Sequence, residues 1–235
     1  MATVRKPGRP VDRDLRERRR GEILDAAARM FAAKGYAGAD TQALADSLGI
    51  AKGTVFRYFP TKRELFVAAI ERAMERLRSR VDTVALGLTD PLAKLTRAIE
   101  AYLRFFDECP EVVELLVLER AELKDRKSTY FDRRDRRAES ERGWRQVVAE
   151  LVATGRFRAI DPERILGFIG DLLYGTIFSH LMSGRTSPLS AQAPDVVEFV
   201  LHALVAIPGR PSRGPRMRPL PGRRTAGRGD PGRRA

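Results

Sequence analysis

The chain has 235 residues, a single cysteine and a formal net charge of +13. This length suffices for one or two domains with a buried core. One cysteine excludes an internal disulfide, no apolar run reaches the roughly 18 residues of a membrane span, and the basic N-terminus lacks the apolar stretch of a secretory signal. We therefore expect a cytoplasmic protein that makes no membrane contact.

The positive charge is concentrated at the two ends. Residues 1–20 have a net charge of +5 and residues 208–235 one of +8, whereas residues 21–207 contain equal numbers of basic and acidic side chains. Basic ends favour nucleic acid as a partner, because phosphate contacts release counterions. The alternative is that arginine, glycine and proline are simply tolerated in an unfolded end.

Residues 1–15 carry charge and two prolines without periodicity, which predicts a flexible basic arm. Within it, Lys6-Pro7-Gly8-Arg9-Pro10 resembles an AT-hook. In such a motif an extended arginine, here Arg9, fits the narrow minor groove of A·T-rich DNA. A nonspecific tether explains the same residues equally well.

A first helix is predicted over residues 16–34. Its apolar residues recur at spacings of three and four, as on one face of a helix, and Gly35 is expected to end it. These apolar positions are Ile23, Ala26, Ala27, Met30 and Phe31.

Residues 41–59 predict two short helices, 41–48 and 52–59, joined by a tight turn in which Gly49 takes a positive φ. In the second helix Val55 and Phe59 share one face at i, i+4 and are expected to point inward. The outer side is then left with a cation, a hydroxyl, an aromatic ring and an arginine, which suits the major groove of DNA. These outer residues are Lys52, Gly53, Thr54, Phe56 and Arg57.

The rest of the chain is also predicted to be helical. Thr61 and Glu64 have the spacing of a capping box, so a fourth helix starts there and runs to about Val84. Further helices are expected at 91–107, 110–125, 128–154, 162–182 and 194–206, four of them with proline where the first helical residue would lie. No segment alternates like a strand. Six prolines among residues 208–235 predict a disordered basic tail.

The helices 162–182 and 194–206 are unusually apolar. The first has apolar side chains around most of its circumference, which predicts burial on more than one side. Gly167, Gly170 and Gly175 would let another backbone come close. We therefore expect these two helices to form a homodimer interface, with a purely internal core as the alternative.

The segment from Ile23 to Leu65 resembles the TetR family of bacterial transcriptional regulators. The resemblance is carried by the helix end FAAKGY (31–36), the turn LGI (48–50), and the segments KGTVFRYF (52–59) and PTKREL (60–65). This covers about a fifth of the chain, with many positions at fixed spacing. Two residues depart from the family pattern: Ala51 replaces a helix-capping serine, and Phe56 replaces a common tyrosine.

The resemblance implies an all-α dimer. Residues 16–62 would form a three-helix DNA-binding domain with a helix-turn-helix, and residues 63–207 a helical ligand-binding and dimerisation domain. The partner would be double-stranded DNA with a palindromic operator. By position, Lys52, Gly53, Thr54 and Phe56, with Gln42, would face base edges, while Thr41, Arg57, Tyr58 and Lys62 would contact phosphates. The alternative for each is a solvated surface residue.

The resemblance also implies an unknown small-molecule effector. Aromatic and aliphatic side chains between the later helices could line an apolar pocket, and the polar residues Asp171 and His180 could orient a ligand there. Plain core packing is the alternative for each. The candidates are Tyr102, Phe105, Phe106, Leu116, Phe168, Asp171, Leu172 and Phe178.

The sequence does not favour an enzyme. It has two histidines, one cysteine, no glycine-rich phosphate loop and no paired metal ligands, so we predict no catalytic residue, metal or cofactor. The leading hypothesis is a sequence-specific DNA-binding transcriptional regulator, a repressor released by a small apolar effector and associated with the nucleoid. The alternative is an architectural or nonspecific DNA-binding protein driven by its basic tails.

Overall fold

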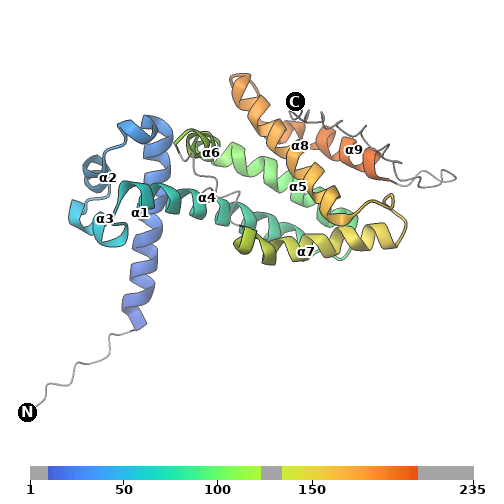
Figure 1. Ribbon diagram of the computed structural model, residues 1–235, viewed down its shortest axis with the longest axis horizontal. Helices are drawn as coiled ribbons and strands as arrows, with labels where there is room; N and C mark the ends of the chain where they lie inside the picture. The colour runs from blue at the N-terminus through green and yellow to red at the C-terminus, as the bar shows by residue number, and fades with distance from the viewer. Residues whose placement is uncertain (1–9, 123–133, 206–235) are drawn as a thin grey trace, which may run out of the picture.

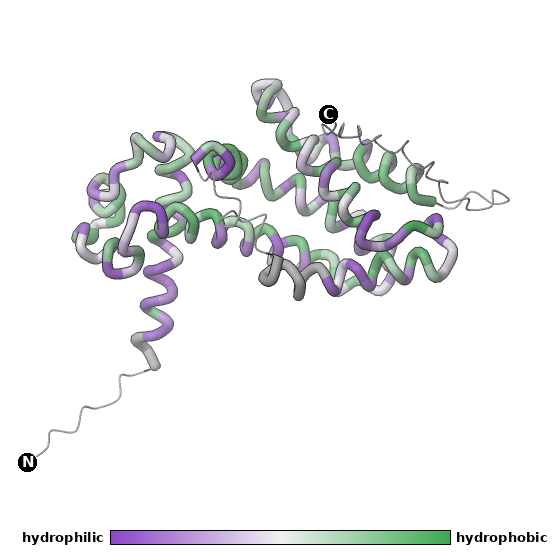
Figure 2. Tube along the Cα trace, viewed as in Figure 1, coloured by the Kyte–Doolittle hydropathy of each residue, from purple (hydrophilic) through white to green (hydrophobic). Residues whose placement is uncertain are grey.

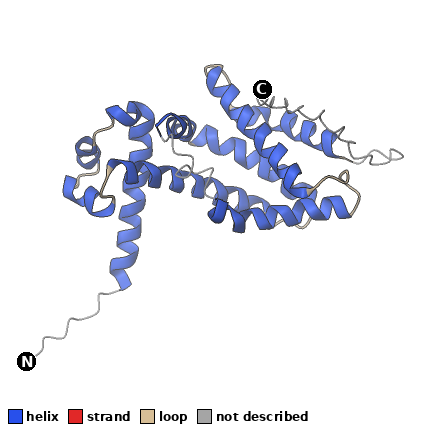
Figure 3. Ribbon diagram, in the orientation of Figure 1, coloured by secondary structure: helices blue, strands red, loops and turns tan. Residues whose placement is uncertain are grey.

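The computed structural model describes residues 10–122 and 134–205 (Figure 1). The described residues form helices joined by turns and loops (Figure 3). The only β feature among them is an isolated bridge between Phe157 and Val205. The prediction of an all-α fold is confirmed. The helices are α1 (Pro10–Gly38), α2 (Thr41–Ser47), α3 (Lys52–Tyr58), α4 (Lys62–Ala85), α5 (Pro91–Glu108), α6 (Glu111–Glu122), α7 (Arg134–Ala153), α8 (Pro162–Met182), the 3-10 helix η3 (Leu189–Gln192) and α9 (Ala193–Leu204).

The helices form two groups that α4 connects (Figure 1). α1, α2 and α3 lie at one end of the molecule, and α5, α7, α8 and α9 lie at the other. α4 packs against both α1 and α5, and α6 also packs against α1. The first group therefore contacts the second through two helices, α4 and α6.

Aromatic packing fills the core of the N-terminal group. Phe31 of α1 and Phe66 of α4 are both fully buried, with their ring centroids 4.9 Å apart in an edge-to-face arrangement. Tyr36 meets Phe66 edge to face, with the ring centroids 5.2 Å apart, and stacks on Phe31 at 6.0 Å. Because Phe66 belongs to α4, the fourth helix completes the core of the three helices before it. The expected domain boundary after residue 62 stays a prediction.

α1 begins earlier than predicted. We expected a flexible arm through residue 15, but the helix starts at Pro10. Proline suits a first helical turn, and Asp14 lies near the helix N-terminus, where negative charge is favourable. Residues 1–9, with Arg9, lie outside the described part. Gly35 interrupts the helix as expected, with a φ of 69°, although one further helical turn follows to Gly38.

Proline marks the later helix starts less uniformly than predicted. Pro91 and Pro162 are the first residues of α5 and α8, each preceded by an aspartate whose side chain accepts a hydrogen bond from the first turn. Pro110 instead precedes α6, and Pro194 is the second residue of α9, because η3 runs directly into that helix. The predicted tail 208–235 and residues 123–133 lie outside the described chain.

α8 and α9 leave apolar side chains uncovered. α8 buries one face, through Ile165, Ile169, Leu173 and Ile177. Within the single chain Phe168 is 56% exposed, so a purely internal core does not account for α8. Burial of its other sides against a second copy stays a prediction. Figure 2 shows the many apolar positions along both helices. The other large exposed apolar residues on these helices are Tyr174, Met182 and Phe199.

Among the described helices, α8 alone is long and apolar enough to cross a membrane by length and composition, with 22% of its most apolar window buried. The apolar runs in the sequence did not predict such a helix. A single match of this kind is weak evidence for a membrane, because a helix that packs against another protein helix has the same composition.

Candidate nucleic-acid interface

A tight turn fixes the angle between α2 and α3. Asp40 caps α2, accepting a hydrogen bond of 2.8 Å from the backbone N–H of Gln42. Gly49 has a φ of 63°, a conformation in which a side chain would be strained. The backbone N–H of Ile50 donates to the carbonyl of Ala45 at 3.0 Å. The chain therefore reverses within a few residues and presents α3 beside α2.

α3 is held by two buried side chains. Val55 is 1% exposed and Phe59, which follows the helix, is 4% exposed. Lys52, Gly53 and Arg57 are consequently exposed on the opposite side, as predicted from the i, i+4 spacing. Phe56 is also exposed, and the Lys52 ammonium lies 5.9 Å from the centre of its ring. The outer face of α3 therefore carries cations and one aromatic ring.

The other predicted DNA-contacting residues differ in the exposure of their side chains and in the contacts that these side chains already make. Thr54 and Tyr58 are half-buried, and Thr41 is only 9% exposed, which leaves little of its side chain available. The Gln42 side chain donates to Asp46 at 2.8 Å. The Lys62 ammonium donates to the carbonyl of Ala37 at 3.1 Å and lies 5.2 Å over the ring of Tyr36. Lys62 thus ties the start of α4 to the end of α1.

Comparison with known proteins agrees with this architecture. The family model for bacterial regulatory proteins of the TetR family matches residues 23–69, and a tetracyclin repressor-like C-terminal domain model matches residues 88–177. The transcriptional repressor KstR2 of Mycolicibacterium smegmatis is 29% identical over 175 residues, which cover 74% of this chain and 83% of that protein. The chain belongs to the TetR family.

Two further similarities define how far the likeness extends. The transcriptional activator FasR of Mycolicibacterium smegmatis is 34% identical over 92 residues, which span 39% of this chain but only 42% of FasR. The crystal structure of FadR from Bacillus subtilis in complex with stearoyl-CoA has the same fold, with a TM-score of 0.62 at 20% identity, covering 77% of this chain and 97% of that one. This TetR-family chain is a DNA-binding transcriptional regulator.

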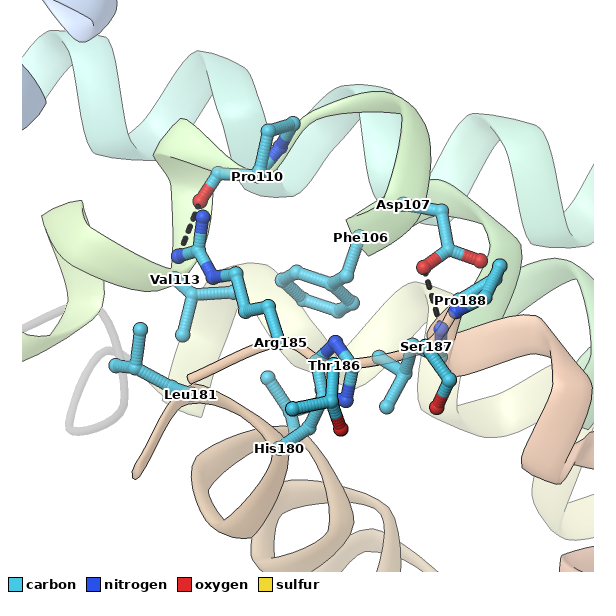
Figure 4. Close-up of a pocket in the computed structure, with 12 residues that line it drawn as sticks. Phe106, Asp107, Pro110, Val113, His180, Leu181, Arg185, Thr186, Ser187 and Pro188 are labelled. Atoms are coloured by element: carbon cyan, nitrogen blue, oxygen red, sulfur yellow. Dashed lines mark hydrogen bonds between the residues drawn. The ribbon is translucent and has the colours of Figure 1, made fainter. Parts of the chain in front are cut away.

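A pocket of about 420 Å³ lies in the second group of helices of the TetR-family chain (Figure 4). Phe106 and Asp107 line it from α5, His180 and Leu181 from α8, and Thr186 from the segment between α8 and η3. Its walls are mostly apolar, with a few polar groups. The remaining lining residues are Pro110, Val113, Ile177, Arg185, Ser187, Pro188 and Leu189.

Of the eight candidates for effector binding, Phe106 lines this pocket, and so does His180, which the sequence offered as a residue that orients a ligand. Phe105 and Leu116 are buried in the core, whereas Phe168 and Asp171 are exposed on α8. The other seven candidates do not line this pocket, and their role in ligand binding stays a prediction. The spacing along a helix shows which residues are apolar, but the pocket also depends on residues 185–189, which have no helical period. Tyr102, Leu172 and Phe178 are half-buried outside the pocket.

Hydrogen bonds hold the rim of the pocket. The Asp107 carboxylate accepts from the backbone N–H groups of Leu189 at 2.6 Å and Ser190 at 2.8 Å. Burial alone would raise the pKa of Asp107, but the hydrogen bonds from Ser190 and Leu189 outweigh it and lower that pKa. Arg185, which has a φ of 55°, donates to Glu114 at 3.0 Å and to the carbonyl of Pro110 at 3.3 Å. The segment after α8 is thereby tied to α5 and α6.

The missing helix cap at Ala51 allows a direct test of local stability. Ala51 precedes α3 in an extended conformation and makes no side-chain cap hydrogen bond. The substitution Ala51→Ser should raise the free energy of unfolding by about 1 kcal/mol, because serine can accept a hydrogen bond from the first turn. Urea denaturation followed by circular dichroism at fixed protein concentration measures this change. As a control, Thr61→Ala removes the existing cap of α4 and should lower the free energy of unfolding. A lower free energy of unfolding in Ala51→Ser would contradict the prediction.

Proposed function

We propose that this protein is a ligand-responsive repressor that binds a palindromic operator as a homodimer. The observation that carries the proposal is the outer face of α3, which exposes Lys52, Gly53, Phe56 and Arg57 while Val55 anchors the helix from behind. A short helix so exposed fits the major groove. Two copies in one dimer would read two half-sites about 34 Å apart.

The proposed contacts divide into base and phosphate contacts. Lys52 can donate to guanine, and a side chain at Gly53 would meet no neighbouring atom, so this position leaves room for close approach of a base. The methyl group of Thr54 and the ring of Phe56 can contact thymine methyl groups. Gln42 would reach a base after giving up its hydrogen bond to Asp46. Phosphates would be bound by Thr41, Arg57, Tyr58 and Lys62, with Arg9 in an adjacent minor groove.

The proposed dimer forms through α8 and α9. Both helices expose large apolar side chains, including Phe168 at 56%, Met182 at 76% and Phe199 at 63%. Large exposed apolar side chains of this kind favour an interface between proteins. In a twofold dimer each residue of the patch meets the same patch on the second copy. The glycines of α8 have open space around their Cα atoms, which allows a second helix to approach closely.

The proposed effector is a small apolar molecule that binds the pocket beside Phe106 and His180. Relatives named for such chemistry support this class: KstR2 of Mycobacterium tuberculosis is described as a ketosteroid transcriptional regulator, and FadR was crystallised with stearoyl-CoA. An effector can change DNA binding only if it binds one conformation better than another. Pro110 and Val113 line the pocket at the start of α6, and α6 packs against α1. FasR is named an activator, so the repressor assignment follows KstR2.

The operator is tested by selecting binding sites from random duplex DNA with the full chain. We expect a palindromic sequence, and the double variant Lys52→Ala/Thr54→Ala should lose at least tenfold in affinity for it, because each base contact contributes about 1–3 kcal/mol. Fluorescence anisotropy measures the dissociation constants at one salt concentration. Arg104→Ala, which removes an exposed cation from α5, is the control and should bind normally.

Deletion of residues 208–235 separates this proposal from nonspecific binding by the basic tails. Sequence preference should survive the deletion. If the selection returns no preferred sequence, or if all binding disappears with the tail, the chain is a nonspecific DNA-binding protein.

The dimer interface is tested by placing charge on the exposed apolar face. Phe168→Glu and Phe199→Glu, made separately, should each shift the protein from dimer to monomer and weaken operator binding, because two like charges would be buried across the twofold axis. Light scattering gives the molar mass. Val84→Glu places the same charge on an exposed apolar position of α4 and should leave the dimer intact. A monomeric wild-type protein would remove this part of the proposal.

The effector site is tested by filling the pocket. A thermal-shift screen with ketosteroids and fatty acyl-CoA esters supplies a stabilising ligand. Leu181→Phe should abolish that stabilisation and the ligand's effect on operator binding while DNA affinity stays normal, because the larger ring occupies the cavity. Leu172→Phe makes the same change on α8 outside the pocket and should leave the response intact. The opposite pattern would place the ligand at the residues predicted from the sequence.

A further inference from the structure

The N-terminal part of α1 projects from the molecule as a helix that touches no other described helix in Figure 1. Every residue from Arg13 to Arg20 is exposed, and Gly21 is the first buried residue of the helix for which burial is described. With a rise of 1.5 Å per residue, this exposed stretch of eight residues extends the helix by about 12 Å. We name residues 13–20 the α1 extension.

The α1 extension is strongly basic. It contains five arginines and two acidic residues within eight positions, and Figure 2 shows it as a hydrophilic stretch of the chain. The folded body between residues 21 and 207 has no net charge. The extension therefore holds a local positive charge that the body lacks. Arginine is well suited to phosphate, because its planar guanidinium can donate two parallel hydrogen bonds.

One face of α1 changes character where the helix leaves the domain. Positions 13, 16, 20, 24, 27 and 31 recur at spacings of three and four and therefore share a face. Leu24, Ala27 and Phe31 on this face are 1%, 0% and 0% exposed. The three earlier positions are arginines. The face that packs on the domain thus continues outside it as Arg13, Arg16 and Arg20.

This arginine face is directed toward the α3 side of the domain. The guanidinium of Arg20 lies 5.4 Å from the centre of the Phe59 ring, and Phe59 directly follows α3. Arg16 and Arg13 lie one and two turns further out on the same face. DNA bound to the outer face of α3 would therefore pass beside an arginine row held on a rigid helix.

We infer that the α1 extension binds the phosphate backbone of DNA beside the groove that receives α3, with Arg13 and Arg16 making the contacts. The inference rests on the proposed DNA-binding role of α3. A contact to phosphates adds affinity and fixes the register of the protein, but it reads no bases. The extension then supplies the electrostatic attraction that the neutral body does not.

The test compares two double variants that remove the same charge from different faces of the helix. Arg13→Gln/Arg16→Gln changes the arginine face. Arg18→Gln/Arg19→Gln changes positions that lie off this face, and Arg19 is already paired with Glu22 at 2.8 Å. Both are measured by fluorescence anisotropy over a series of salt concentrations, on the selected operator and on a random-sequence duplex.

The first variant should reduce the slope of log K against log salt by about two, as expected when about two phosphate contacts are lost. It should weaken binding to both duplexes by a similar factor, so that sequence preference is retained. The second variant should change the slope by much less. Equal slopes for the two variants would overturn the inference.

Two further measurements keep the outcome decisive. The variant Arg13→Lys/Arg16→Lys retains the charge and should restore most of the slope of log K against log salt. Circular dichroism of the glutamine variant shows whether the helix has melted, because melting would lower its helix content. If Arg13→Gln/Arg16→Gln changed the molar mass of the protein and left the salt slope unchanged, the arginine face would be a protein contact. That result would overturn the inference. Failure of operator selection refutes the proposed function alone, since the random duplex still tests the extension.

Discussion

The structure depends on the packing of α4 against α1. Phe66 of α4 meets Phe31 of α1 edge to face in a fully buried core, and this pair fixes the two helices on which α2 and α3 rest. A side chain at Gly21 would come within 2.8 Å of the Arg72 guanidinium, so glycine permits the close approach. Arg72 donates to both oxygens of Asp25, at 2.8 and 3.0 Å. The pair is about one-third exposed, so its contribution is to orientation more than to stability.

The same α1 that supports α3 is also in contact with the second half of the molecule. α6 packs against α1, and the start of α6 forms part of the pocket wall through Pro110 and Val113. Arg185 connects this wall to the segment after α8, because its guanidinium donates to the Pro110 carbonyl and to Glu114. A molecule in the pocket would therefore act on a helix that already touches the DNA-binding end. This direct contact between α6 and α1 would be sufficient to couple the pocket to the DNA-binding end.

Local patterns in the sequence predicted those features that depend on local physics. The i, i+4 pair Val55 and Phe59 fixed the inner side of α3 because both are buried in the same core. Asp90 and Asp161 with the prolines after them marked the starts of α5 and α8, since capping and a fixed φ act within one turn. Thr61 caps α4 as expected: the Glu64 N–H donates to the Thr61 hydroxyl at 3.1 Å, and that hydroxyl donates to the Glu64 carboxylate at 3.1 Å.

Features that depend on distant parts of the chain were missed. The first residues of the α1 extension, up to residue 15, were expected in a flexible arm, because an exposed stretch of helix needs no apolar period. The pocket combines α5, α6, α8 and the segment before η3, and no pattern within one helix shows that these meet. Around α8, apolar residues indicate burial but do not distinguish burial in the same chain from burial against another. Phe168 was placed in a ligand site for that reason, although it is exposed.

The short recognition helix gives the last constraint. α3 has seven residues, and the proposed base contacts involve four of them, so base contacts from one subunit supply only a few kcal/mol of discrimination. The body between residues 21 and 207 has no net charge and adds no long-range attraction. In the proposed function, affinity for one site among many comes from using α3 twice in a dimer and from arginines placed beside it. The exposed faces of α8 and α9 and the α1 extension are the two described surfaces whose chemistry fits those two requirements.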